Sequence, residues 1–246
     1  REGFVAGFAM VKVNGLWGYM NSSLNMAVPA TFNRATYFDK GIGIGKKARS
    51  VYVIHSDGRE TIIPFEGLTD GKPFSEGFSA VRIGGLYGFV NSNAELKIEP
   101  KYKVVGPFSN GLAVASIKGD SVGFINTNGE WVVEPIYDKA HDFSEGFARA
   151  KKGPNWVLID AKGNEFLVDL ATKFGDFHDD LCYARNGALA GFLNKELAWA
   201  IKPQFEEVRD FSYGLAPAKV DGLWGFIDKT GKMVIEAKYA AVKSFT

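Results

Sequence analysis

Phenylalanine recurs along this chain of 246 residues at nearly constant intervals. The successive separations are 34, 36, 34, 35, 34, 34 and 34 residues. A period of about 20 to 50 residues is typical of repeat architectures, in which a small unit buries its apolar face only by stacking on its neighbours. The spacing therefore predicts seven copies of one unit. Their anchors are Phe4, Phe38, Phe74, Phe108, Phe143, Phe177 and Phe211, and Phe245 stands at the anchor position that follows the seventh copy.

Each copy contains the sequence signals of three β-strands. The anchor opens a tight turn, Phe-Ser-Glu-Gly-Phe at residues 74–78 and 143–147, and small residues then alternate along a first strand. A second strand carries an aromatic-glycine pair, such as Trp17-Gly18, and ends at an asparagine or aspartate turn. A third strand closes with proline, a variable residue and an aromatic, as at residues 100–102. Three strands and their turns use the whole repeat, so no helix is expected.

These units predict an all-β fold of seven three-stranded antiparallel repeats, in one array spanning residues 1–246. Two arrangements are compatible with such an array: a closed propeller-like ring, or an open β-meander or solenoid. An open array needs polar end caps, whereas the first and last copies keep their apolar faces, so we favour the ring. The predicted repeats are approximately 4–37, 38–73, 74–107, 108–142, 143–176, 177–210 and 211–244.

The repeated unit resembles the motif of the WG-repeat family, also called KWG repeats. That motif is glycine, a variable residue, tryptophan-glycine, an aromatic, isoleucine and aspartate or asparagine, followed by a glycine turn and a strand ending in proline, x, tyrosine. The likeness covers essentially the whole chain and is clearest at Trp17-Gly18 and Trp224-Gly225, while copies two, five and six depart from it at this pair. The resemblance implies a β-rich repeat of mainly bacterial proteins, and it brings no catalytic residues.

Composition argues against several classes of function. Lysine plus arginine number 29 and aspartate plus glutamate 28, with no block of like charge, so we expect no nucleic-acid partner. No run approaches the roughly 18 apolar residues of a membrane-spanning segment. One cysteine excludes an intramolecular disulfide. We expect a soluble protein and favour an exported or cell-envelope-associated bacterial location over a cytoplasmic one, the compartment remaining open.

Two chemically suggestive features coincide with repeat positions. The glycine-rich stretch at residues 41–47 would need a following helix to hold phosphate, and the repeat predicts a strand there. Cys182 occupies a first-strand position that is alanine in copies five and seven (Ala148 and Ala216). We therefore predict that Cys182 is a small buried core residue rather than a nucleophile. We therefore expect no catalytic residue, no cofactor and no metal ion.

The surface around copies four to six is the most individual part of the chain. Copy five has Asp169 where others have proline and Ala171 where others have an aromatic, and copy six replaces Ser-Glu-Gly by His-Asp-Asp. Polar residues near the anchors of these copies should lie along one rim of the array. The candidate binding residues are His141, Asp142, Lys173, Asp176, His178, Asp179, Asp180, Glu206 and Asp210.

This pattern favours a non-enzymatic binding module or scaffold whose repeat loops contact another protein. A lectin-like propeller that binds carbohydrate or another ligand is the alternative, and a hydrolase with rim carboxylates, including Asp179 beside His178, is a third hypothesis. For the first hypothesis we expect replacement of Lys173, Asp179 and Glu206 to weaken partner binding without changing stability.

Overall fold

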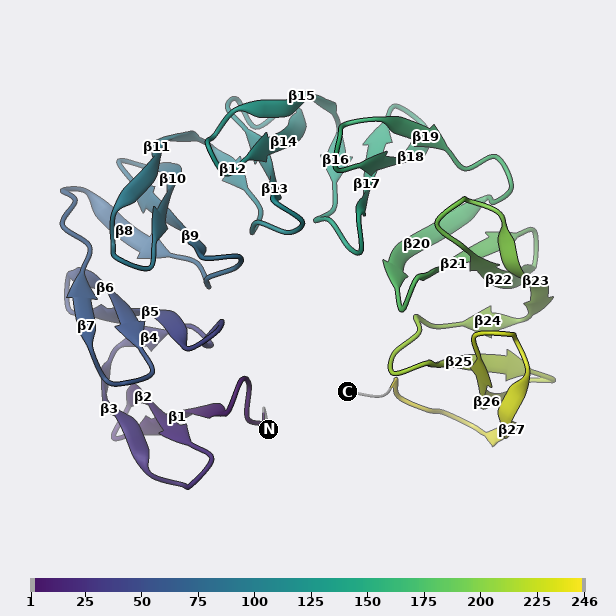
Figure 1. Cartoon of the computed structure of the whole chain (residues 1–246), viewed down its shortest axis with the longest axis horizontal. Helices are drawn as coiled ribbons and strands as arrows, with labels where there is room; N and C mark the ends of the chain where they lie inside the picture. The colour runs from purple at the N-terminus through teal and green to yellow at the C-terminus, as the bar shows by residue number, and fades with distance from the viewer. Residues whose placement is uncertain (1–2, 245–246) are drawn as a thin grey trace. The chain divides into compact units, whose positions relative to one another are not determined.

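The computed structural model describes residues 3–244, which form 27 β-strands and no helix. The strands make seven antiparallel sheets that follow one another along the chain (Figure 1). The all-β prediction is therefore confirmed. No helix long and apolar enough to cross a membrane occurs among these residues. The last predicted anchor, Phe245, lies outside the described part of the chain.

The chain divides into two compact units, residues 1–138 and 139–246, and the division falls between the fourth and fifth sheets along the chain. Closure of the array into a ring stays a prediction.

The first unit holds sheet one with β1 (Phe8–Val13), β2 (Leu16–Asn21) and β3 (Met26–Phe32); sheet two with β4 (Arg34–Ala35), β5 (Ile42–Lys47), β6 (Ser50–His55) and β7 (Glu60–Ile62); sheet three with β8 (Leu68–Gly71), β9 (Phe78–Ile83), β10 (Leu86–Asn91) and β11 (Leu96–Tyr102); and sheet four with β12 (Val104–Val105), β13 (Leu112–Ser116), β14 (Val122–Asn126) and β15 (Trp131–Tyr137). The second unit holds sheet five with β16 (Lys139–Ala140), β17 (Phe147–Lys152), β18 (Asn155–Asp160) and β19 (Glu165–Leu167); sheet six with β20 (Lys173–His178), β21 (Leu181–Asn186), β22 (Leu189–Leu193) and β23 (Trp199–Phe205); and sheet seven with β24 (Glu207–Val208), β25 (Leu215–Val220), β26 (Leu223–Asp228) and β27 (Met233–Tyr239).

Six of the seven described sheets have a fourth strand in addition to the three predicted. Consecutive strands are neighbours in every sheet, so each sheet is an antiparallel meander. In five of these six sheets the added strand precedes the phenylalanine anchor, whereas β20 of sheet six contains the anchor Phe177; in all six it pairs with the first predicted strand, as β12 pairs with β13. In four sheets it has only 2 residues. A strand that short shows no alternation of polar and apolar residues, which is why the sequence pattern does not indicate it.

The glycine of the aromatic-glycine pair controls the third strand. A Cβ placed on Gly88 would lie 2.3 Å from the carbonyl oxygen of Ile98, so only glycine lets β11 pass so closely. The five sheets with this glycine have a third strand of 7 residues with a bulge. Tyr52 and Val157 take its place in copies two and five, and there β7 and β19 have 3 residues and no bulge. The side chain at this position therefore shortens the strand that follows.

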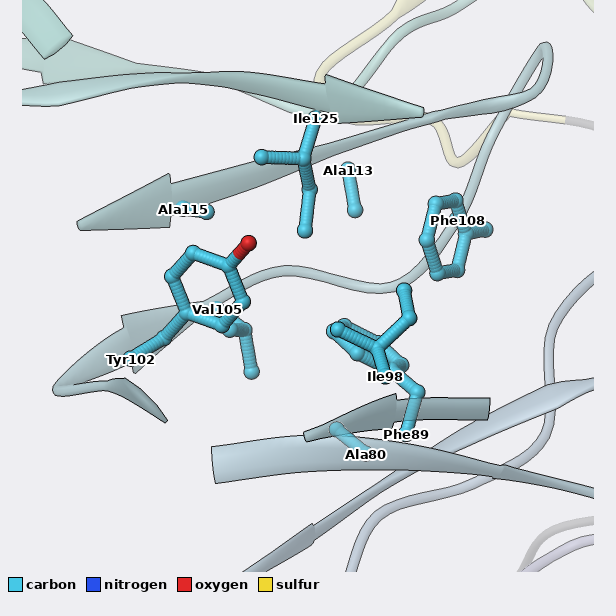
Figure 2. Packing of buried hydrophobic residues seen from close by; sticks show 9 residues of the cluster. All are labelled: Ala80, Phe89, Ile98, Tyr102, Val105, Phe108, Ala113, Ala115 and Ile125. Carbon is cyan, nitrogen blue, oxygen red and sulfur yellow. The ribbon is translucent and has the colours of Figure 1, made fainter. Parts of the chain in front are cut away.

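Large apolar side chains fill the junction between sheets three and four. Figure 2 shows Phe89 and Ile98 of sheet three facing Ile125 of sheet four, with Phe108 beside them. The Phe89 and Phe108 ring centroids are 4.8 Å apart. Tyr102, at the end of β11, is fully buried, and its hydroxyl donates to the Gly129 carbonyl at 3.0 Å. The aromatic that ends a third strand thus completes the core between two sheets.

Six of the seven described anchors are buried, at no more than 4% exposure, as predicted. Two of them show the packing on the sheet of the preceding copy: Phe38 stacks on Tyr19 at 3.9 Å, and Phe211 lies 4.7 Å from Phe192. Phe4 precedes the first sheet and is 48% exposed, so the prediction that it is a core residue is wrong.

Candidate binding site in repeat five

Repeat five lacks the aromatic that completes the core in other repeats. Because Val157 replaces the glycine, β19 stops at Leu167, and the chain turns with the Ala171 N–H donating to the Val168 carbonyl at 3.3 Å. Asp169 and Ala171 stand at the proline and aromatic positions. No large side chain of this segment therefore fills the space toward β20.

A pocket of about 660 Å³ occupies this space. We call it the repeat-five pocket. One of its lining residues, Leu167, is apolar and 61% exposed, and Leu170, between the lining residues Asp169 and Ala171, is 46% exposed. A smaller pocket of about 200 Å³ adjoins it and shares Lys173. The residues that line the repeat-five pocket are Arg149, Pro154, Asn155, Trp156, Leu167, Val168, Asp169, Ala171, Thr172, Lys173 and Phe174.

Arg149 forms a fixed cationic part of the pocket wall. Its Nε donates to Asp176 Oδ1 at 2.6 Å and its Nη2 to Oδ2 at 3.1 Å, while Nη1 donates to the Phe174 carbonyl at 3.0 Å. The guanidinium also lies over the Trp156 ring, 5.6 Å from its centroid. Burial acts to lower the pKa of Arg149, but the hydrogen bond and charge of Asp176 outweigh burial and raise it. The side chain is therefore held as a cation.

Of the two predicted histidines, His141 lies next to this ion pair and His178 lies beside Asp210. The His141 Nδ1 is 3.4 Å from Arg149 Nη2, and because a guanidinium can only donate, Nδ1 is the acceptor in this contact. The centroid of the His141 ring is 5.5 Å from that of the Trp156 ring. Asp142, the next residue along the chain, is exposed. His178 Nε2 lies 3.9 Å from Asp210 Oδ2.

Asp210 has an unusual environment. Its Oδ1 is buried and accepts no hydrogen bond from any residue in the range 3–244. Burial raises the pKa of this carboxyl; His178 and Arg149 act to lower it, while the charge of Asp176 raises it further. The structure thus brings His141, Asp176 and Asp210 close to Arg149, and His178 close to Asp210.

Asp179 has a structural role instead. Its Oδ2 accepts the Gly214 N–H of the next repeat at 2.7 Å. Glu76 does the same in the first unit, where its two oxygens accept the N–H groups of Asn110 and Gly111, each at 2.8 Å. Glu145 accepts the Asp180 N–H at 2.7 Å. In these three repeats a carboxylate at the same turn position therefore links its turn to the next one, a role that becomes visible only when the turns are seen side by side.

Glu206 also binds backbone rather than lying free on the surface. Both its oxygens are 3.2 Å from the Gly222 N–H, in the turn between β25 and β26, and its carbonyl accepts Arg185 Nη2 at 2.7 Å. We therefore expect replacement of Asp179 or Glu206 to lower stability, contrary to the prediction from sequence. Asp180 is exposed and pairs with Lys195 at 2.7 Å and Lys229 at 3.4 Å.

Sequence reasoning missed Arg149, Trp156 and Leu167 as members of the site. A signal for Arg149 exists, because it is the only charged residue at the sixth position after an anchor. The other residues at that position are Met10, Ile44, Ala80, Val114, Tyr183 and Pro217.

The reactive side chains near the pocket are not arranged as a nucleophile with its base. Cys182 is fully buried, its Sγ donates to the Gly175 carbonyl at 3.2 Å, and burial raises its pKa to about 12. Such a thiol stays protonated at neutral pH. Residues 41–47 form a turn and β5. Within the range 3–244 no group of three or more His, Cys, Asp or Glu side chains is placed to hold a metal ion.

The comparisons with known proteins agree on a propeller-like repeat fold. A crystal structure of a eukaryotic initiation factor is similar with a TM-score of 0.60 at 11% identity, covering 92% of this chain and 71% of that one. KlHsv2, with loop 6CD replaced by a Gly-Ser linker, is similar with a TM-score of 0.51 at 10% identity, covering 89% and 88% of the two chains. Both are β-propellers, and likeness at such low identity shows the fold alone.

The sequence assigns the family within this fold. The profile of the family described as WG containing repeat matches residues 17–47, 53–87, 87–119, 123–156, 191–224 and 224–246. These segments cover more than half of the chain, which therefore belongs to the WG-repeat family. No curated protein matches it. Residues 157–190, which include much of the repeat-five pocket, lie outside the matched segments.

Proposed function

We propose that this chain is a non-enzymatic binding module that presents the repeat-five pocket to another protein. The observation that carries the proposal is the exposed apolar surface at a concave site, where Leu167 lines a space of about 660 Å³ and Leu170 is exposed between two lining residues, Asp169 and Ala171. Exposed apolar side chains beside a pocket are typical of interaction sites. The polar turns contribute less than the sequence suggested, because Asp179 and Glu206 bind backbone.

A carbohydrate is the alternative ligand for the same pocket. Trp156 offers an aromatic surface beside the charged side chains of Arg149 and Asp169, a combination that sugar-binding sites use. A lectin built from repeats would be expected to keep such a set in several copies, and five sheets instead place an aromatic from their own third strand opposite this position. This difference favours a protein partner.

Replacement of one exposed residue tests the proposal. Leu167→Asp puts a charge at the pocket mouth, and Val234→Asp puts one on the third strand of sheet seven, where the side chain is 56% exposed. We expect affinity capture of partner proteins with the intact chain to be lost with Leu167→Asp and kept with Val234→Asp. Capture that survives Leu167→Asp places the interface elsewhere.

The same variants separate the other hypotheses. Glycan binding that is lost with Leu167→Asp would favour the lectin alternative. Turnover of glycans or phosphoesters that is lost with Asp210→Asn would favour a hydrolase acting through His178 and Asp210.

A further inference from the structure

Five sheets show what fills the space that is open in repeat five. In each of them, the residue equivalent to Trp156 lies opposite the aromatic that ends the third strand. β19 ends at Leu167, opposite Val157, so no residue of this strand lies opposite Trp156. The five pairs are Trp17 with Phe32, Tyr87 with Tyr102, Val122 with Tyr137, Ala190 with Phe205, and Trp224 with Tyr239.

The pocket has the size and walls to accept such an aromatic from outside. Its volume of about 660 Å³ is in the usual range of ligand pockets. Trp156, Val168 and Phe174 give it apolar walls, and Ala171 leaves the aromatic position empty. A ring that enters can bury about 150 to 250 Å² of its surface, which makes it a strong anchor for a partner.

The sheet edge at Trp156 also offers a backbone acceptor. In repeat two, which has an equally short third strand, the Ile63 N–H donates to the Val51 carbonyl at 2.9 Å. The equivalent donor in repeat five, Val168, makes no such bond to Trp156 within the described residues. An unpaired strand edge of this kind is where extended peptides add to sheets.

Charge at the pocket favours an acidic partner. Arg149 and Lys173 line it against Asp169 alone, and Arg149 already holds Asp176. Lys173 is exposed and forms no ion pair with any residue from 3 to 244. Arg185, in the adjoining pocket, donates only to backbone carbonyls. A carboxylate of the partner is therefore the group that Lys173 and Arg185 lack.

We infer that the repeat-five pocket binds an extended acidic segment of a partner protein, which inserts a tyrosine or phenylalanine beside Trp156. This inference rests on the proposed function. The chain itself shows how the ring of such a segment is seated, because β11 brings Tyr102 into the corresponding place in sheet three, opposite Tyr87. The acidic character of the partner is inferred from Lys173, which has no ion-pair partner among residues 3–244. The partner's ring packs on Trp156, its backbone N–H donates to the Trp156 carbonyl, and its carboxylate approaches Lys173.

The test uses the capped peptide Ile-Glu-Pro-Ala-Tyr as the probe, titrated into the whole chain by calorimetry. This is the sequence of residues 98–102 with alanine in place of the lysine, so that the peptide has a net negative charge. We expect saturation at one site, and binding about tenfold weaker or worse when alanine replaces the peptide's tyrosine. Lys173→Glu should weaken the peptide and favour a version with lysine in place of glutamate. Lys202→Glu, an exposed position on β23, is the matched control and should change neither.

A second variant restores the missing aromatic. Ala171→Tyr should fill the pocket from within and abolish peptide binding. Unchanged peptide binding by Ala171→Tyr overturns the inference. If thermal unfolding shows that this variant does not fold, the charge reversal at exposed Lys173 decides instead, and equal behaviour of Lys173→Glu and Lys202→Glu overturns the inference.

Failure of the inference and failure of the proposed function give different results. If the peptide does not bind but Leu167→Asp still abolishes partner capture, the inference is wrong and the proposed function stands. If neither effect occurs, both are wrong. A dimer in sedimentation that Ala171→Tyr converts to a monomer would assign the pocket to a second copy of this chain and overturn the partner assignment.

Discussion

The junction between sheets three and four and the junction between sheets five and six differ at one position of the second strand. Gly88 lets the bulged β11 pass, and this strand brings Tyr102 into the core. Val157 occupies the same position in repeat five, β19 stops early, and a pocket remains. The length of the third strand thus depends on whether the second strand has a Cβ at this position.

Repeat two separates the loss of the glycine from the opening of a pocket. Tyr52 replaces the glycine there, and β7 is as short as β19. The pocket beside it has only about 270 Å³, because Ile63 is buried and Phe65 and Leu68 pack against the same cluster. The residues after the shortened strand therefore decide whether the gap is filled.

Gly88→Val is the strongest way to test this comparison, since it gives repeat three the side chain of repeat five. The added Cβ would lie 2.3 Å from the Ile98 oxygen and 2.9 Å from Pro100 N, so β11 must move and Tyr102 must leave the core. We expect a loss of about 3 to 5 kcal/mol in the free energy of unfolding, measured with urea. Gly3→Val is the control, because nothing lies within 4 Å of its added Cβ. Equal stability of the two variants would contradict the role given to the glycine.

The sequence predicts the closed junction between sheets three and four better than the open junction between sheets five and six. The phenylalanine period and the strand signals predict the seven sheets and the burial of six anchors, because stacking repeats impose the same demand on every copy. They also mark Asp169 and Ala171 as exceptions. The pocket depends on the effect of Val157 on the neighbouring strand, and the local sequence pattern does not indicate that effect. The structural roles of Asp179 and Glu206 depend on backbone N–H groups in another turn, which the local pattern does not indicate either.

Arg149→Leu tests whether the open junction is held by an ion pair in place of an aromatic. The change leaves Asp176 partly buried without its bidentate partner, so we expect a loss of about 1 to 3 kcal/mol in the free energy of unfolding. Arg34→Leu is the control, because its pair with Asp70 is 3.9 Å long and exposed, and exposed pairs contribute about 0 to 1 kcal/mol. Equal losses in the two variants, measured by urea denaturation, would contradict a structural role for Arg149.

Asp210→Asn tests the charge environment of the open junction, and we expect it to change stability less than Arg149→Leu does. Burial raises the pKa of Asp210 above the ordinary value of 3.8, so the folded protein binds this proton more tightly than the unfolded chain does. The stability that results is fully present below the unfolded pKa and is lost as the pH rises through the folded pKa. We therefore expect Asp210→Asn to gain stability relative to the parent as the pH rises from about 4 to 7, measured by thermal unfolding.

Asp57→Asn is the control for that experiment, because its stability relative to the parent should change with pH in the opposite direction. The Arg59 backbone N–H holds the pKa of Asp57 below its ordinary value, so this carboxyl contributes stability above the unfolded pKa and loses it as the pH falls. Its replacement should lose stability relative to the parent as the pH rises. Parallel pH profiles for the two variants would show that the environment of Asp210 is not the cause.

Asp180→Gly has the smallest expected effect and concerns the turn at the open junction. Asp180 donates its N–H to Glu145 at a φ of 68°, and Gly111 donates to Glu76 at a φ of 77° in the closed junction. Glycine adopts this left-handed conformation without strain, so we expect Asp180→Gly to raise the free energy of unfolding by about 0.5 to 1 kcal/mol. Its ion pairs are exposed and contribute little.

Asp180→Ala completes that comparison, because alanine removes the carboxylate without the conformational freedom of glycine. We expect the alanine variant to be about 1 kcal/mol less stable than the glycine variant in urea denaturation. If both variants instead lose the same stability relative to the parent, the ion pairs with Lys195 and Lys229 outweigh the strain of the turn. The open junction would then differ from the closed one in its surface charges as well as in its core.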